Sequence, residues 1–175
     1  RNCRLAFPPL IVSGKNFLEI HHKPDKAKLK RFVIVDFGVK YKRYCSDMTR
    51  MLYIGKPIKE ELELYNLVRK VQENALKNLQ IGVDYCDIDL KARNDFGKYK
   101  KYFEHGLGHG VGKKVHQKPW INFKSKDLVK ENDIVTIEPG IYTKSLGSRI
   151  EDTVLVRKNK TEILTPLSKE LIVLD

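Results

Sequence analysis

The sequence has 175 residues, within the usual range for one domain and long enough to bury one full core. Hydrophobic residues make up 41% and charged residues 32%, which excludes a disordered chain, and no apolar run is long enough to span a membrane. The 34 basic and 22 acidic residues give a formal net charge of +12, which leaves a polyanionic partner open.

The first half of the chain predicts a β-hairpin followed by two helices. Residues 31–37 and 48–54 are short apolar runs rich in β-branched side chains and are separated by polar residues, as in a hairpin. Across residues 59–79 the apolar side chains recur every three or four positions, which is typical of an amphipathic helix. A second helix should begin near Asp87 and end at Gly97.

The second half predicts strands. Residues 105–112, HGLGHGVG, carry glycine at alternate positions, and each glycine would cost a helix about 1 kcal/mol, so this segment should be loop or extended chain. Strand-like runs follow at residues 115–123, 133–142, 149–156, 162–164 and 171–174. Strands, then helices, then strands indicate a single α+β domain with an antiparallel sheet.

Asp36 and Asp47 lie in the two arms of the predicted hairpin, at equal distances from a turn at Tyr41 and Lys42. Directly opposite residues are about 5 Å apart, and like charges there are destabilising. Asp36 also follows four apolar residues, where burial without a partner would be costly. A cation between the two carboxylates would resolve both problems. Two unrelated acids, at a strand end and in a turn, are the alternative for this pair taken alone.

Glu138 and Glu151 repeat the pattern around a second turn at Lys144 and Ser145. Four clustered carboxylates could not all ionise at neutral pH without a metal. With one imidazole they would suit a pair of divalent ions about 3.5 to 4 Å apart that activates a bridging water. The two pairs therefore predict a hydrolase site.

The imidazole must come from one of the five histidines, which are His21, His22, His105, His109 and His116. His105 and His109 have HxxxH spacing, but the glycines around them prevent the helix that an HExxH zinc site needs. The sequence therefore excludes a thermolysin-like site. Any single histidine could be a surface or structural residue, whereas three within residues 105–116 could supply one ligand and two proton-handling groups.

These motifs resemble the pita-bread metallopeptidases, family M24, and most closely their Xaa-Pro branch, the prolidase and aminopeptidase P group. The segments that carry the resemblance are IVDFG around Asp36, YCSDMTR around Asp47, HGLGHGVG at 105–112, IEPGIY at 137–142, RIED at 149–152 and SGKNFLEIHHKP at 13–24. The resemblance implies an α+β pita-bread fold with an antiparallel sheet and flanking helices, and a catalytic metallopeptidase domain over residues 1–175.

The same resemblance implies the metal site. Two divalent ions would be held, and Mn, Co, Zn and Fe all suit a carboxylate-rich site with one histidine. Asp47 and Glu151 would bridge the two ions. The five ligands would be Asp36, Asp47, His109, Glu138 and Glu151.

Further roles also follow from the resemblance. Glu138 would act as general base for the bridging water. His105 and His116 would hold the scissile carbonyl and stabilise the charge that develops on it. His21 would contact the substrate near its amino end, and Arg149 would orient the bridging carboxylates. His22 should be non-catalytic.

His105 favours the Xaa-Pro branch, because the methionine aminopeptidases do not usually carry a histidine there. The expected substrates are Xaa-Pro dipeptides or peptides with proline in second position. Lys113 and Lys114 depart from the family pattern, in which an apolar and an acidic residue are commoner after HGVG. The leading helices of the fold do not precede residues 8–14, so we expect a C-terminal part of a longer protein that forms a homodimer.

Two alternatives remain open at this stage: a methionine aminopeptidase-like enzyme, and a non-catalytic pita-bread module that binds peptide or nucleic acid. The net charge of +12 is the main support for the module. The charge is scattered, however, and all five ligands are retained, so nucleic acid is not the favoured partner. The N-terminus lacks the apolar run of a secretory signal, and the cysteines show no disulfide or zinc-finger spacing, so a cytoplasmic protein without a membrane partner is expected.

Overall fold

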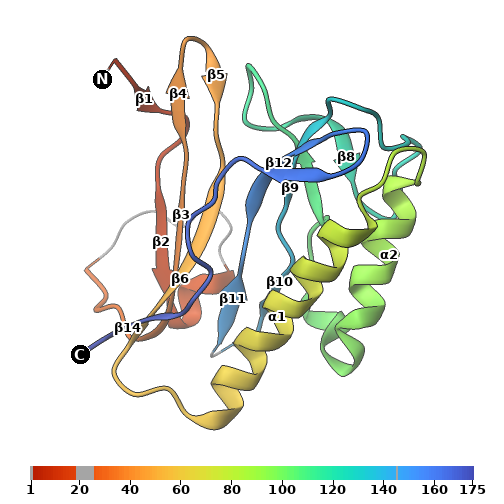
Figure 1. Cartoon of the computed structure of the whole chain (residues 1–175). Helices are drawn as coiled ribbons and strands as arrows, with labels where there is room; N and C mark the ends of the chain where they lie inside the picture. The colour runs from red at the N-terminus through yellow and green to blue at the C-terminus, as the bar shows by residue number, and fades with distance from the viewer. Residues whose placement is uncertain (1, 19–25, 145) are drawn as a thin grey trace.

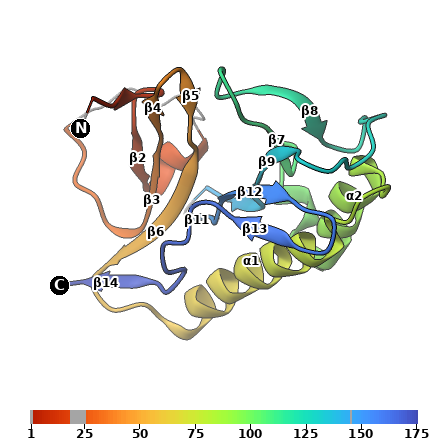
Figure 2. The ribbon, with the colours of Figure 1, turned by 45° about the horizontal axis from the view of Figure 1, so that its top comes forward.

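A computed structural model describes residues 2–18, 26–144 and 146–175. Two sheets lie side by side, and the helices pack beside the second sheet (Figure 1). In the tilted view of Figure 2, the helix α1 (Lys59–Asn78) runs alongside β12 and β13 of this second sheet. Among the described helices, none combines the length and the apolar character that a membrane crossing requires.

The first sheet has four strands in the order β14-β6-β3-β2. The strands β2, β3 and β6 are antiparallel, as expected, and β14 adds a parallel strand at the edge beside β6. A parallel neighbour needs a long crossover, and here the helices and the second sheet lie between the two strands in the sequence. The bounds are β2 (Leu10–Ser13), β3 (Arg31–Phe37), β6 (Met48–Ile54) and β14 (Ile172–Leu174).

The hairpin turn lies one residue later than predicted, at Lys42 and Arg43. Both residues have positive φ, 44° and 77°, as a two-residue type I′ turn requires. The predicted pairing of Asp36 with Asp47 is therefore wrong, and Asp36 lies opposite Thr49. The shift is two residues, so Asp47 and Thr49 share a face and both carboxylates still point the same way.

Three short strands extend this hairpin into a small separate sheet. β1 pairs with β4, and β4 pairs with β5, all antiparallel. Their bounds are β1 (Arg4–Leu5), β4 (Val39–Tyr41) and β5 (Tyr44–Cys45).

The second sheet has the order β13-β12-β9-β7-β8, and a two-stranded ladder, β10-β11, continues β9 and β12. Ile137 pairs with Asp152, and Gly140 pairs with Arg149, so both ladders share one register. Glu138 and Glu151 therefore lie opposite each other between the ladders, as the sequence predicted. The bounds are β7 (Gly108–Gly110), β8 (Gln117–Ile121), β9 (Ile134–Ile137), β10 (Gly140–Tyr142), β11 (Gly147–Arg149), β12 (Asp152–Val156) and β13 (Thr161–Ile163).

Both predicted helices are present, as α1 (Lys59–Asn78) and α2 (Tyr85–Asp95). The apolar stripe of α1 is buried and includes Val68 at 0% and Val71 at 1% exposure. Gly97, which follows α2, has a φ of +54° that favours glycine. Two short 3-10 helices are also described: η1 (Gly14–Leu18) follows β2, and η2 (Gly97–Tyr102) follows α2.

The glycine-rich segment forms β7 in extended conformation, in agreement with the prediction. A Cβ on Gly108 would lie only 2.0 Å from the carbonyl oxygen of Thr136 in β9. Glycine at this position therefore lets β7 approach β9 closely enough to carry His109 into the junction between the sheets.

Candidate metal centre

The five predicted ligands come together where the two sheets meet. Asp36 lies near the end of β3, Asp47 directly precedes β6, and His109 is the central residue of β7. Glu138 follows β9 and Glu151 precedes β12. These side chains come from five different elements, so only the tertiary fold assembles them.

Their ligand atoms form overlapping groups, within each of which all the atoms lie within 4.8 Å of one another. One group contains Asp36, Asp47 and Glu151, and a second contains His109, Glu138 and Glu151. The two groups share Glu151, which is the arrangement expected when one carboxylate bridges two ions. His116 joins a third group with Asp47 and His109.

The acidic cluster is electrostatically strained without a cation. Burial, followed by the negative charges of Asp36 and Glu138, raises the pKa of Asp47 to about 7. Burial and the same neighbouring carboxylates raise the pKa of Glu151 well above its ordinary value. The positive charge of Arg149 lowers both pKa values, but not enough to offset burial and the neighbouring carboxylates, so the metal-free cluster favours protonation of these two groups.

Glu138 behaves differently from its neighbours. Burial works against its ionisation, but a hydrogen bond from His109 and the nearby histidines lower its pKa to about 2. The Nε2 atom of His109 lies 3.3 Å from a carboxylate oxygen of Glu138. Glu138 is therefore ionised at neutral pH.

The residues fit a divalent cation. Asp36 Oδ1 is buried and has no hydrogen-bond partner among the described residues. Such an orphaned carboxylate oxygen is costly unless a cation occupies the space that it faces. Carboxylate oxygens with one imidazole are donors that Mn, Co, Zn and Fe accept.

His109 is oriented for coordination. Its Nδ1 atom lies 3.2 Å from the carbonyl oxygen of Gly110, which can only accept a hydrogen bond. Nδ1 therefore carries a proton, and Nε2 faces the carboxylates, where its own proton is donated to Glu138 in the metal-free protein. When a cation binds, Nε2 would lose this proton and offer its lone pair instead. The exposed ring of His116 lies at the mouth of the cluster, with its centroid 4.2 Å from that of His109.

Arg149 supports the cluster from the adjoining strand, β11. It forms an ion pair with Asp36, and its Nε atom donates to the hydroxyl of Thr49 over 3.1 Å. The same hydroxyl donates to Glu151 over 2.6 Å. Arg149 and Thr49 thus connect a predicted terminal ligand to a predicted bridging ligand.

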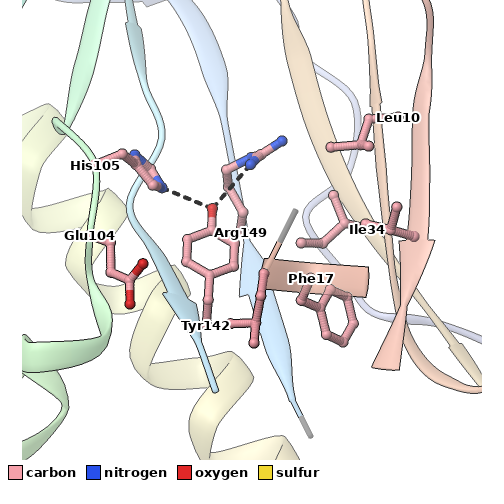
Figure 3. Close-up of a pocket in the computed structure, with 9 residues that line it drawn as sticks. Leu10, Phe17, Ile34, Glu104, His105, Tyr142 and Arg149 are labelled. Atoms are coloured by element: carbon pink, nitrogen blue, oxygen red, sulfur yellow. Dashed lines mark hydrogen bonds between the residues drawn. The ribbon is translucent and has the colours of Figure 1, made fainter. Parts of the chain in front are cut away.

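A hydrogen-bonded chain leads from Arg149 into an apolar pocket beside the cluster (Figure 3). Arg149 donates to the Tyr142 hydroxyl over 3.0 Å, and that hydroxyl lies 2.8 Å from His105 Nε2. His105 Nδ1 lies 2.7 Å from the carbonyl oxygen of Gly106, so Nδ1 donates and Nε2 accepts from Tyr142. Burial lowers the pKa of His105, in agreement with a neutral ring.

Sequence reasoning missed Thr49 and Tyr142. Thr49 lies two residues after Asp47, so alternation along β6 would have placed both on one face. Tyr142 gave no such signal, because its contact with His105 spans 37 residues. The predicted substrate contact His21 lies outside the described residues. The exposed indole of Trp120 lies 6.4 Å from the His109 ring.

Together, the fold and the carboxylate–histidine cluster match those of the metallopeptidases with the pita-bread fold. Residues 2–158 match metallopeptidase family M24, and the chain belongs to this family. The predicted membership and fold are confirmed, and the relatives agree with the Xaa-Pro branch.

Individual relatives can be named. An Xaa-Pro dipeptidase from Pyrococcus horikoshii is 37% identical over 172 residues, which are 95% of this chain and 49% of the dipeptidase. The structure of a prolidase from Thermococcus sibiricus matches with a TM-score of 0.92 at 39% identity, over 97% of this chain and 48% of the prolidase. An X-Pro aminopeptidase from Thermotoga maritima matches with a TM-score of 0.92 at 36% identity, over 97% of this chain and 50% of the aminopeptidase. The chain thus spans about half the length of these relatives.

Proposed function

We propose that this domain hydrolyses the peptide bond between an N-terminal residue and proline, using two divalent metal ions. The observation that carries the proposal is the pair of ligand groups that share Glu151. The relatives named Xaa-Pro dipeptidase, prolidase and X-Pro aminopeptidase support the substrate class. The substrates would be Xaa-Pro dipeptides or longer peptides with proline in second position.

In this proposal Asp36, Asp47, His109, Glu138 and Glu151 hold two ions such as Mn, Co, Zn or Fe. When bound, the ions supply activation of a water molecule and polarisation of the scissile carbonyl. The ionised Glu138 accepts the proton of the attacking water and returns it to the departing amine. A glutamine at this position would preserve the shape of the side chain and remove the base.

The other histidines and Arg149 have separate roles in this proposal. His116, exposed at the mouth, donates a hydrogen bond to the scissile carbonyl as charge develops on its oxygen. His105 already uses Nδ1–H for Gly106, so it holds the Tyr142 hydroxyl in place along the wall of the pocket. Arg149 fixes the orientation of Asp36 and, through Thr49, that of Glu151. His21 remains the predicted contact near the substrate's amino end.

The first test is proline release from an Xaa-Pro dipeptide by the protein in its full natural chain. The reaction is measured with Mn or Co, then with excess chelator, beside a Met-Ala peptide and a longer Xaa-Pro peptide. Chelator-sensitive cleavage confined to Xaa-Pro is expected, and the ratio of dipeptide to longer peptide separates dipeptidase from aminopeptidase. Cleavage of Met-Ala alone would favour the methionine aminopeptidase alternative.

A matched pair of variants assigns the base. Glu138→Gln should lower kcat at least about 100-fold, because the general base is lost while the fold and most of the ligands remain. Glu63→Gln, on the exposed face of α1, should keep wild-type kcat. An unchanged kcat in Glu138→Gln would remove Glu138 from the mechanism. No cleavage of any peptide despite bound metal would favour a binding module.

In the full natural chain we also expect a cytoplasmic homodimer.

A further inference from the structure

Two basic segments meet at the mouth of the metal centre and form what we call the basic rim, residues 39–45 and 112–118. The amide of Cys45 donates to the carbonyl oxygen of Gly112 over 2.8 Å. The Lys40 ammonium donates to the carbonyl oxygen of Lys113 over 2.9 Å. The β4–β5 hairpin and the loop after β7 accordingly lie at the same end of the molecule (Figures 1 and 2).

The rim carries one sign of charge. Residues 37–46 and 105–126 contain no aspartate or glutamate. Within the described part of the chain, no carboxylate forms an ion pair with any of the six basic side chains of the rim. These side chains are Lys40, Lys42, Arg43, Lys113, Lys114 and Lys118. All but the half-buried Lys40 are exposed, so their charges reach solvent at the mouth.

The rim and the apolar pocket lie on opposite sides of the metal centre. β3 runs from Ile34, which lines the pocket, to Asp36 and then through β4 into the rim. β7 and its neighbours follow the same order, from His105 in the pocket through His109 to the rim. A peptide that crosses the metal centre must therefore place one end in the pocket and the other against the rim.

The positive charge of the rim determines the direction in which a peptide crosses the metal centre. The rim repels an α-ammonium group and attracts carboxylates. The pocket is apolar on most of its walls, and its charged lining residues are Glu104 at the edge (Figure 3) and Arg149, which is paired with Asp36. This arrangement suits an N-terminal residue whose apolar side chain enters the pocket, whose ammonium group stays near the carboxylates of the metal centre, and whose peptide continues along the rim.

We propose that the basic rim binds carboxylate groups of the substrate beyond the scissile bond, so that peptides with an anionic group downstream of proline are preferred. The proposal rests on the proposed function and deepens it by naming a substrate class. The carboxylate is that of an acidic side chain that follows proline in the peptide. Lys113 and Lys114, which depart from the family pattern, would then determine specificity.

The test compares kcat/KM for the tripeptides Ala-Pro-Glu and Ala-Pro-Gln in the full natural chain. Their ratio, the acidic preference, should exceed one and fall roughly three- to tenfold in the double variant Lys113→Gln/Lys114→Gln, because two exposed charge pairs are lost. Salt at about 1 M, where the Debye length is about 3 Å, should reduce the wild-type preference in the same way. Amidating the C-terminus of Ala-Pro-Gln measures the contribution of the terminal carboxylate separately.

The control is Lys158→Gln/Lys160→Gln in the turn between β12 and β13, which removes the same charge away from the rim and should keep the acidic preference. Equal kcat/KM for the two tripeptides would overturn the proposal and leave the peptidase intact. An acidic preference that survives in the rim variant would do the same. If no peptide is cleaved, the proposed function fails. Calorimetric binding of the same peptides to the metal-loaded protein then decides. Tighter binding of the acidic peptide, lost in the rim variant, supports the rim, and equal binding overturns it.

Discussion

Glu151 and Asp152 are consecutive and almost fully buried, at 2% and 0% exposure, yet their surroundings are opposite. Glu151 faces three other carboxylates, and its pKa is raised. Asp152 points the other way and accepts from Arg50 over 2.6 Å and from Lys169 over 2.7 Å. Although burial opposes it, hydrogen bonds from these two cations lower the pKa of Asp152.

The contrast separates two uses of a buried charge. Asp152 has permanent partners, so its ionised form is part of the folded structure. Glu151 and its neighbours have too few cationic partners, so their ionised form needs a cation from solution. Burial alone therefore does not identify a functional carboxylate, whereas the sign of its neighbours does.

The largest expected effect comes from removing the charge of Asp152, the carboxylate with permanent cationic partners. Asp152→Asn should lower the free energy of unfolding by about 3 to 5 kcal/mol, because Arg50 and Lys169 would keep buried charges without a counterion. Urea denaturation measures the change. Glu170→Gln, which breaks an exposed pair with Arg69, is the control and should cost about 0 to 1 kcal/mol. Similar losses in both variants would contradict the comparison.

The second prediction concerns Glu151, whose ionised form needs a cation from solution. Mn at about 100 times its Kd should raise the unfolding free energy of the wild type by about 2.7 kcal/mol. Glu151→Gln should lose most of this increase and, without metal, should be at least as stable as the wild type, because it removes one of the mutually repelling charges. Thermal or urea denaturation with and without Mn measures both values. A metal-free variant that is clearly less stable would assign Glu151 a structural role.

The smallest expected effect concerns a third buried carboxylate, which can be compared with Glu151 and Asp152. Glu61 is buried in α1 and accepts from Tyr53, the amide of Ile58 and the half-exposed Arg31. Burial opposes ionisation, but these hydrogen bonds lower the pKa of Glu61 below its usual 4.5. A lowered folded pKa gives stability that is present above the unfolded pKa and lost as the pH falls through the folded pKa.

Glu61→Gln should therefore cost about 1 kcal/mol at neutral pH and flatten the acid side of the stability curve below about pH 4.5. Unfolding free energies measured from neutral pH to about pH 3 test this difference. The exposed Glu63→Gln should leave the curve unchanged, since Lys59 is 3.9 Å away and both side chains are largely exposed. An unchanged slope in Glu61→Gln would show that Glu61 ionises equally in the folded and unfolded states.

Local patterns in the sequence predicted the elements well but fixed the register only where the turn was placed correctly. The Glu138–Glu151 pairing was correct, and the Asp36–Asp47 pairing was two residues off because the turn at Lys42 and Arg43 has no glycine or asparagine to mark it. Both carboxylates still reached the same cluster, since a shift of two residues preserves the face.

The supporting contacts were beyond sequence reasoning. Arg149 was placed beside the ligands only through family resemblance, and its hydroxyl partner Tyr142 was not foreseen. Asp152 and Arg50 lie 102 residues apart, and nothing in either local sequence marks them as partners. Such pairs depend on how the two sheets meet, which no periodicity encodes.

The Arg50 side chain has one more consequence. Its guanidinium donates to the carbonyl oxygens of Thr165, Leu167 and Ser168, over 3.0, 2.8 and 3.1 Å, and β14 then pairs with β6. During synthesis, β6 leaves the ribosome more than a hundred residues before these partners exist. The sheet that carries Asp36 and Asp47 must wait in an incomplete state until residues 165–174 emerge, so its completion is a late folding event.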